Sequence, residues 1–348
     1  MKRAGPGLGI LCLLSVCGLL AGCLPGNGPT PRPRPSSTAA PPGITEQPQG
    51  PSVSGRLLYA SQGHIWLYTG TATRRLTGPT PASQPAWSPD GKQIAFVVRG
   101  EGYSDIWVME ADGSHPHPVT ANRSTYPEQS HEAAHTSYWA FQPQWIPPDG
   151  AWIGYISHYE PRQLSSLLSV WRIRPDGSGE QPYLSLNGFI ENPTWSPDGQ
   201  YMALTLFTYD HGAQLRYLDR NTGKVLRLGQ DVEGIERYDP AWSPDGQWIA
   251  YAARQAGATQ IWLMPSPLNP LYPEEWTPRL LSPQKAARGP AWSPDGKQIA
   301  FIAEQDGSFD LWLLTLEAAA DGFPHPAGEA RLTYGAQVDA TSRPSWAP

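Results

Sequence analysis

The pattern Pro-x-Trp-x-Pro occurs six times in this chain and limits its fold more than any other feature. Its tryptophans recur at intervals of about 50 residues, at Trp87, Trp145, Trp195, Trp242, Trp292 and Trp346. Five of the six copies continue into an Asp-Gly pair, as at Asp90-Gly91. A period of this length indicates a repeat architecture in which every copy folds into the same small unit.

Each repeat contains four segments with the composition of β-strands. In the last complete copy, the Pro-x-Trp strand is followed by runs at residues 298–301, 310–313 and 331–333. Such runs are rich in β-branched and aromatic residues and are bounded by turn residues. We expect the Asp-Gly pair to form a type I′ hairpin turn, which needs positive φ at both residues. The repeat therefore predicts an all-β protein, a six-bladed β-propeller of four-stranded blades. The 39 prolines and 35 glycines also exclude long helices.

The two ends of the repeat region complement each other. Residues 344–348 form a first strand with no hairpin after it, whereas residues 56–59, 64–68 and 74–77 read as second, third and fourth strands. We therefore expect one blade in which the C-terminal strand joins the three N-terminal strands and closes the ring.

The N-terminal segment has the pattern of a secretory leader. Lys2 and Arg3 precede an apolar stretch at residues 8–20, which is too short to span a bilayer. The following Leu20-Ala21-Gly22-Cys23 resembles the bacterial lipobox, in which the cysteine is lipidated. The alternative is an ordinary signal peptide that is cleaved after small residues. We expect residues 1–22 to be a lipoprotein signal peptide and Cys23 to carry the lipid.

A proline-rich segment separates this leader from the repeats. Residues 23–55 contain nine prolines and almost no apolar periodicity, which favours an extended tether. The folded body is then expected at residues 56–348. This organisation predicts an extracytoplasmic protein that is lipid-anchored to the bacterial cell membrane or envelope, in the periplasm or at the cell surface.

The repeat motif Trp-Ser-Pro-Asp-Gly-x-x-Ile-Ala-Phe, with the segments 106–113 and 331–333, resembles the repeat of TolB-type propellers across residues 56–348. Similar repeats occur in prolyl-oligopeptidase-like peptidases, tricorn-like proteases and some oligogalacturonate lyases, so the resemblance implies a fold rather than one activity. TolB carries an α/β domain before its propeller, where this chain has the tether. The sequence lacks a Gly-x-Ser-x-Gly elbow, a P-loop and a dinucleotide fingerprint.

Charge and cysteine content limit the classes of partner and cofactor that the protein can bind. The formal net charge of −6 provides no basic surface for nucleic acid. All three cysteines lie within the first 23 residues, so none is left in the body for a disulfide or a cysteine metal site. We expect a monomer with no cofactor.

Propeller topology brings three connections to one face, at residues 121–142, 159–168 and 209–213. These connections carry the candidate ligand- or partner-binding residues His131, His135, Tyr138, Trp139, His158, Tyr159, Tyr209, Asp210 and His211. Aromatic and histidine side chains at a concave mouth suit a ligand or partner surface. The alternative is that they pack one long loop against the body.

His131, Glu132 and His135 match the His-Glu-x-x-His pattern of zinc proteases. The segment is short, lies between blades and has no evident third ligand, so we expect a loop helix and no metal site. We favour a non-catalytic module that binds a protein, peptide or glycan. The alternative is a polysaccharide-active enzyme resembling oligogalacturonate lyase, with His131, His135, His158 and His211 as metal ligands or bases.

Overall fold

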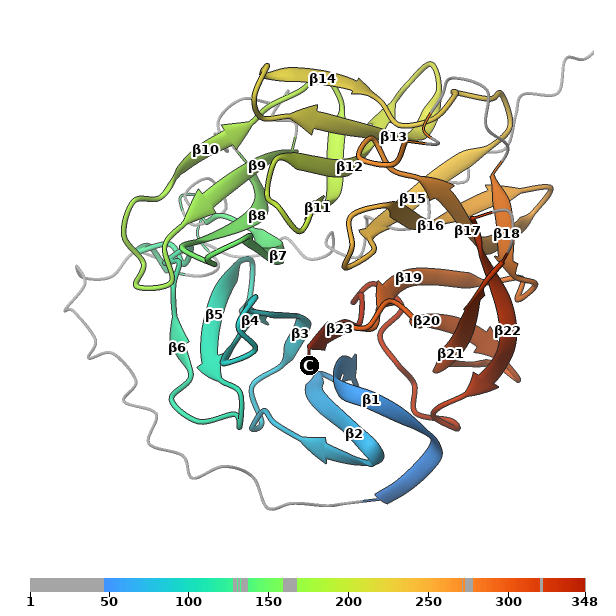
Figure 1. The fold of residues 1–348 in the computed structure, drawn as a ribbon. Coiled ribbons are helices and arrows are strands. Elements are labelled where there is room, and N and C mark those ends of the chain that lie inside the picture. Colours follow the sequence, from blue (N-terminus) through green and yellow to red (C-terminus); the bar gives the residue numbers. More distant parts are fainter. Residues whose placement is uncertain are drawn as a thin grey trace, which may run out of the picture. The chain divides into compact units, whose positions relative to one another are not determined.

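The computed structural model describes residues 47–127, 130, 132, 137–158, 168–270, 272, 278–319 and 322–347. These residues form six antiparallel sheets arranged around a central axis (Figure 1). The six-bladed propeller predicted from the repeat is therefore confirmed.

Five blades have four strands each, in chain order from the axis outward. Blade 2 contains β3 (Ala82–Trp87), β4 (Gln93–Arg99), β5 (Ser104–Glu110) and β6 (His117–Pro118). Blade 3 contains β7 (Ala140–Ile146), β8 (Trp152–His158), β9 (Leu168–Ile173) and β10 (Gln181–Leu184). Blade 4 contains β11 (Phe189–Trp195), β12 (Tyr201–Thr208), β13 (Gly212–Asp219) and β14 (Lys224–Arg227). Blade 5 contains β15 (Glu236–Trp242), β16 (Trp248–Gln255), β17 (Ala258–Pro265) and β18 (Arg279–Ser282). Blade 6 contains β19 (Ala287–Trp292), β20 (Gln298–Gln305), β21 (Ser308–Ala318) and β22 (Pro324–Arg331).

Blade 1 closes the ring from both ends of the chain. Its sheet has the order β2-β1-β23, with β1 at Gln47–Ser61, β2 at His64–Arg75 and β23 at Ser345–Ala347. The pairing of Leu57 with Trp346 joins the C-terminal strand to β1, as expected. The segments expected as separate third and fourth strands, residues 64–68 and 74–77, are not separate: β2 contains the first and runs into the second. Leu76 N donates to Ile65 O at 2.8 Å, so the chain has doubled back by residue 76.

The N-terminal boundary of the propeller differs from residue 56. Strand β1 begins at Gln47, inside the range expected for the tether. Its first part pairs with the far end of β2, as Val53 does with Gly70, and register shifts separate this part from the pairing that starts at Arg56. Proline-rich sequence next to a strand gives no periodic signal, which explains why the pattern placed the boundary later.

The turns after the first strands are not type I′. Ser88 O accepts a hydrogen bond from Gly91 N at 2.9 Å, and only the glycine of each Asp-Gly pair has positive φ. Pro89 presets φ near −65° at the second turn position, which selects a type I turn with glycine fourth. The Asp90 carboxylate accepts from the Ser88 hydroxyl at 2.7 Å and from Lys92 N at 3.1 Å, so it stabilises the turn.

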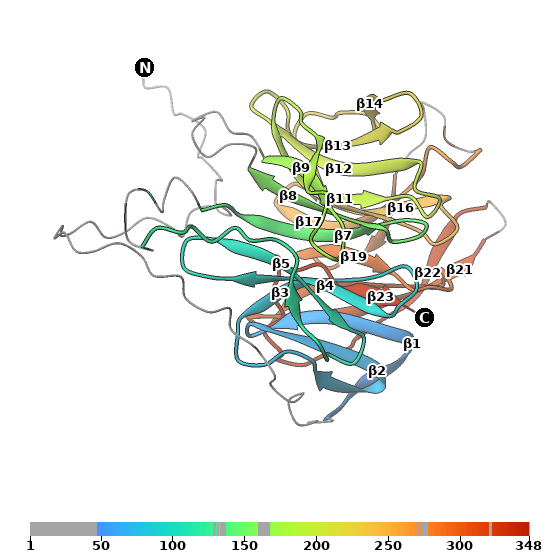
Figure 2. The ribbon, with the colours of Figure 1, turned by 90° about the vertical axis from the view of Figure 1, so that its left-hand side faces the viewer.

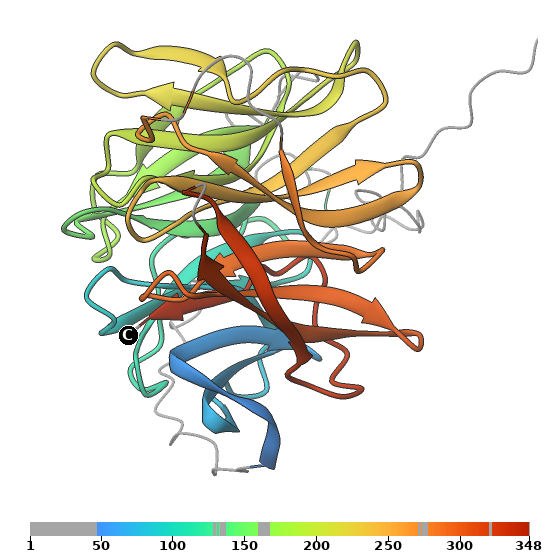
Figure 3. The same ribbon diagram turned by 45° about the vertical axis from the view of Figure 1, so that its right-hand side comes forward.

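Each repeat tryptophan packs against the preceding blade. Trp292 lies in one cluster with Ala241 and Ala250 of blade 5, and Trp145 lies in another with Ala86 of blade 2. Side views show the sheets stacked face to face (Figure 2; Figure 3). Five of the six are buried and Trp346 is partly buried. A buried tryptophan removes roughly 150–250 Å² from water, so these positions supply much of the cohesion between blades.

The strand directions define two faces. The turn face carries the Asp-Gly turns between first and second strands, such as residues 88–92. The loop face carries the connections between second and third strands and between blades, including residues 119–139 and 209–211. No helix within the described residues has the length and apolar character needed to cross a membrane.

Candidate binding site at the channel mouth

The residue before the first proline of each repeat lies closest to the axis. We call these six positions the channel ring: Gln84, Gln142, Asn192, Asp239, Gly289 and Arg343. In the first five the backbone has φ between 51° and 60°. The strand pairing shifts at the same point, as between Glu191 and Thr194. A bulge of this kind re-aims a side chain, and here it places polar groups along the axis.

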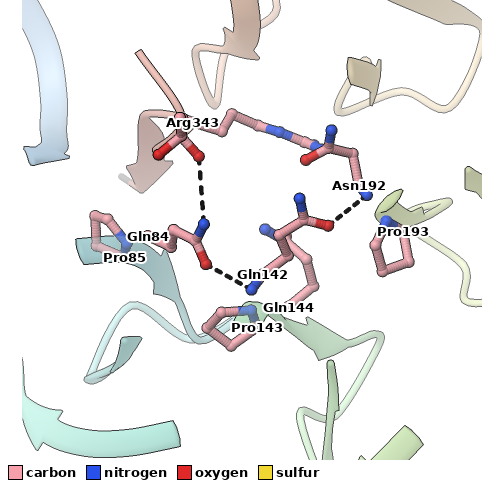
Figure 4. A pocket seen from close by; sticks show the side chains of 9 residues that line it. Gln84, Pro85, Gln142, Pro143, Gln144, Asn192, Pro193 and Arg343 are labelled. Atoms are coloured by element: carbon pink, nitrogen blue, oxygen red, sulfur yellow. Dashed lines mark hydrogen bonds between the residues drawn. The ribbon is translucent and has the colours of Figure 1, made fainter. Parts of the chain in front are cut away.

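Hydrogen bonds run around the channel ring from blade to blade (Figure 4). Gln84 Oε1 accepts from Gln142 N at 2.7 Å, and Gln142 Oε1 accepts from Asn192 N at 2.6 Å. Asn192 Nδ2 donates to Asp239 Oδ1 at 2.6 Å, and Asp239 Oδ2 accepts from Gly289 N at 3.1 Å. The backbone amides of Gln142, Asn192 and Gly289 are thus satisfied by side chains of neighbouring blades.

Arg343 occupies the last position of the ring and reaches across it. Its Nη1 donates to Pro240 O at 3.0 Å, while its buried Nε has no hydrogen-bond partner among the described residues. Burial lowers the pKa of Arg343, and the Asp239 carboxylate opposes that shift. The cavity among these side chains is about 20 Å³, which is room for about one water molecule. The ring therefore constricts the channel.

First strands run from the loop face to the turn face, so residues before the ring line its loop-face mouth. Two of the six residues that directly precede the ring are charged, Glu191 in β11 and Arg288 in β19. Burial raises the pKa of Glu191 to about 7, the Asp239 carboxylate adds to the shift, and Arg288 counters it. The floor of the mouth therefore holds a carboxyl group that titrates near neutrality.

Aromatic side chains lie on one side of the mouth. Trp139 directly precedes β7, and Phe189 begins β11 with 37% of its surface exposed. Phe189 pairs with Phe207 across the sheet, and the Phe207 ring lies 5.8 Å from that of Tyr238 in blade 5. Equivalent positions in blades 1, 2 and 6 hold no aromatic residue; they are Ala340, Ser342, Pro81, Ser83, Ala286 and Arg288. The mouth is therefore aromatic across blades 3–5.

The long connection between blades 2 and 3 is closed at its base. Asn122 N donates to the buried Asp105 carboxylate at 2.8 Å, and Tyr138 N donates to Asn122 O at 3.0 Å. The Ser104 hydroxyl donates to Ala140 O at 2.7 Å. Burial raises the pKa of Asp105. These contacts fix both ends of residues 123–137 beside the mouth.

The structure places six of the nine predicted binding residues. Tyr138 and Trp139 lie at the base of the long connection, and His158 ends β8, where burial lowers its pKa. Tyr209 is 99% exposed at the tip between β12 and β13, next to Asp210 and His211. His131, His135 and Tyr159 lie outside the described residues, as does Cys23. Within the described part of the chain, no group of three or more His, Cys, Asp or Glu side chains is placed to hold a metal ion.

Sequence reasoning missed the channel ring and the charged floor. Their signal was present, because the residue before the first proline varies among copies that are otherwise alike. Variation inside a structural repeat points to positions that the fold itself does not dictate. Asp239 and Arg343 could have been found this way.

Comparison with known proteins supports the fold. No protein-family model matches the chain. An uncharacterized protein of Agrobacterium fabrum, Atu1656, is 28% identical over 164 residues, which are 45% of this chain and 49% of that protein. The match thus spans about half the length of this relative.

Solved structures share the propeller at low identity. TolB from Acinetobacter baumannii has a TM-score of 0.63 at 18% identity, over 85% of this chain and 67% of that one. A putative TolB from Agrobacterium tumefaciens has a TM-score of 0.54 at 17% identity, over 87% and 99%. A chain of a nidogen/laminin complex has a TM-score of 0.57 at 12% identity, over 84% and 98%. The chain is therefore a six-bladed propeller with TolB-like structural neighbours.

Proposed function

We propose that this protein is a lipid-anchored, extracytoplasmic propeller that binds a protein, peptide or glycan partner at its loop-face mouth and does not catalyse a reaction. The observation that carries the proposal is the asymmetry of the mouth. The loop-face ends of blades 3–5 carry aromatic residues, next to a constricted channel with a charged floor. Aromatic residues are enriched where proteins bind partners, since they bury much area for few rotatable bonds.

A lipid anchor and a partner-binding mouth are compatible in one protein. A lipid on Cys23 and an extended tether would hold the propeller near a membrane while leaving its faces free for a partner.

The test is quantitative co-purification from envelope extract with two forms of the mature protein. One is the wild type, and in the other a Gly-Ser-Gly linker replaces residues 123–137. The contact of Tyr138 N with Asn122 O keeps the two ends together, so the propeller should keep its melting temperature. Partners of the mouth should be enriched by the wild type and depleted at least tenfold in the variant. Identical sets from two folded proteins would contradict the role of this face.

The anchor is tested separately with Cys23→Ser. The substitution should move the protein from the membrane fraction to the soluble fraction without changing its melting curve. Continued membrane association of the secreted variant would contradict lipidation at this cysteine.

A further inference from the structure

On the turn face, opposite the mouth, a cleft of about 380 Å³ opens between blade 1 and blade 6. Two apolar residues, Val53 and Leu316, line it together with six hydrogen-bonding residues: Ser52, Ser54, Asp295, Lys297, Gln298 and Thr315. Its volume lies in the range of small-ligand sites. We call it the seam cleft, because blade 1 is where the two ends of the ring meet.

The cleft follows from how the ring closes. Around the turn face, the proline of one turn packs against the glycine of the next. A Cβ on Gly150 would lie 3.0 Å from Pro89, and one on Gly296 would lie 3.4 Å from Pro244. In blade 1, β23 and β1 come from distant parts of the chain, so no such turn joins them. Residues 52–54 pass there instead, and the cleft lies between them and blade 6.

A repeated decapeptide shows how the cleft differs from an ordinary blade junction. Residues 87–96 and 292–301 are both Trp-Ser-Pro-Asp-Gly-Lys-Gln-Ile-Ala-Phe. In blade 2, Gln93 pairs with Glu110, and its Nε2 donates to Glu110 Oε1 at 3.3 Å. In blade 6, the cross-strand neighbour of Gln298 is the shorter Thr315. The buried Gln298 Oε1 has no hydrogen-bond partner among the described residues.

The lining selects a neutral ligand rich in hydroxyl groups. An amide oxygen buried without a donor is costly, and a turn of the Gln298 side chain into the cleft would let a ligand hydroxyl donate to that oxygen. Asp295 and Lys297 contribute one charge of each sign, so a charged ligand would meet a like charge as well as an opposite one. The hydroxyls of Ser52, Ser54 and Thr315 can both donate and accept, as sugar hydroxyls do. We propose that the seam cleft binds a neutral saccharide of one or two sugar units.

The test is saturation-transfer NMR and titration calorimetry on the mature wild-type protein. The probes are cellobiose, maltose and N,N′-diacetylchitobiose, with N-acetyl-tetra-alanine amide as a peptide probe. At least one disaccharide should bind saturably, and Gln298→Leu should weaken that binding at least tenfold. The matched control is Gln93→Leu, which alters the same decapeptide in blade 2 and should leave binding unchanged.

A second variant keeps the proposal open to refutation if Gln298→Leu fails to fold. Thr315→Glu puts a longer, charged side chain into the cleft, where its carboxylate can accept from Gln298 Nε2 as Glu110 does from Gln93 Nε2. It should therefore block the cleft and abolish binding, and keep or raise the melting temperature. Absence of disaccharide binding to the wild type would overturn the proposal. So would binding of the peptide alone, or an equal loss in Gln93→Leu. Because the cleft lies on the face opposite the mouth, these outcomes leave the proposed partner site untouched.

Discussion

At the scale of single residues, the six repeat tryptophans are alike in sequence but unlike in their polar contacts. The indole nitrogens of Trp145 and Trp292 donate to carbonyls of the preceding blade, each at 3.1 Å. Those of Trp195 and Trp242 are buried without a hydrogen-bond partner among the described residues. The sequence pattern predicts well that each tryptophan is buried. Burial alone, however, does not determine how much each tryptophan contributes to the stability of the fold.

This difference predicts unequal effects of the same substitution. Trp292 and Trp242 are 8% and 7% exposed, so replacing either with phenylalanine removes a similar apolar area. Trp292→Phe also removes the hydrogen bond to Ala241 O, whereas Trp242→Phe removes an unsatisfied donor. Urea unfolding should show Trp292→Phe to be the more destabilising by about 1 kcal/mol. Equal losses would show that the indole hydrogen bond contributes nothing.

Glu191 predicts a pH dependence of stability. Its folded pKa of about 7 lies above the ordinary value of 4.5, because burial and Asp239 penalise the charged form. The folded state therefore holds a proton that the unfolded state releases, and this stabilisation is full below about pH 4.5 and lost as the pH rises through 7. Glu191→Gln should remove that part of the pH dependence.

The measurement is urea unfolding of both proteins between pH 4.5 and 8. Taking the difference between wild type and variant cancels other groups, such as Asp105. The variant should gain on the order of 2–3 kcal/mol relative to wild type across this window. A difference that stays constant with pH would place the Glu191 pKa at its ordinary value.

At the scale of elements, the closing strand β23 is short but carries contacts in several directions. It pairs with β1 at three positions. The Ser345 hydroxyl accepts from Trp87 N at 2.9 Å, and the nearby Ser342 hydroxyl accepts from Gln84 N at 2.7 Å. The strand thus joins blade 1 to blade 2 as well as to β1.

Deleting residues 341–348 should therefore open the ring. The deletion removes Arg343, Trp346 and the pairing with β1, so the expected loss is several kcal/mol and a fall in melting temperature of at least about 10 °C. Differential scanning calorimetry measures it. Replacing Glu317, an exposed residue near the outer end of β21, with Ala provides a control that should melt like the wild type. An unchanged melting curve for the deletion would refute closure by this strand.

At the scale of the whole molecule, the sequence predicted the fold because each repeat states the same periodic pattern. Six Pro-x-Trp strands gave the blade number, and complementary ends gave the closure. The predicted turn type was wrong. Asp-Gly alone suggested type I′, but Pro89 restricts the backbone φ at the second turn position and favours type I. The start of β1 at Gln47 was missed, because pairing with Gly70–Thr73 depends on tertiary position.

The site was less predictable than the fold for a related reason. Trp139 was anticipated from its connection. Phe189 and Phe207 come together only through the pairing of β11 with β12, and Tyr238 joins them from the adjacent blade. Glu191 and Arg343 acquire their properties from burial in the channel. The seam cleft depends on Thr315, which lies opposite Gln298 where blade 2 has Glu110 opposite Gln93. The decapeptides that contain Gln93 and Gln298 are identical, so they do not reveal this difference.

The central claim is that a partner occupies the aromatic side of the mouth, and photo-crosslinking in the native envelope tests it most directly. A photoreactive phenylalanine analogue at Phe189 is compared with one at Leu226, which is similarly exposed, at 41% against 37%, but lies on the outer strand β14. We expect a discrete crosslinked product from position 189 that is absent at 226. Equal products at both positions, or none at 189 in a folded, membrane-bound protein, would contradict the account.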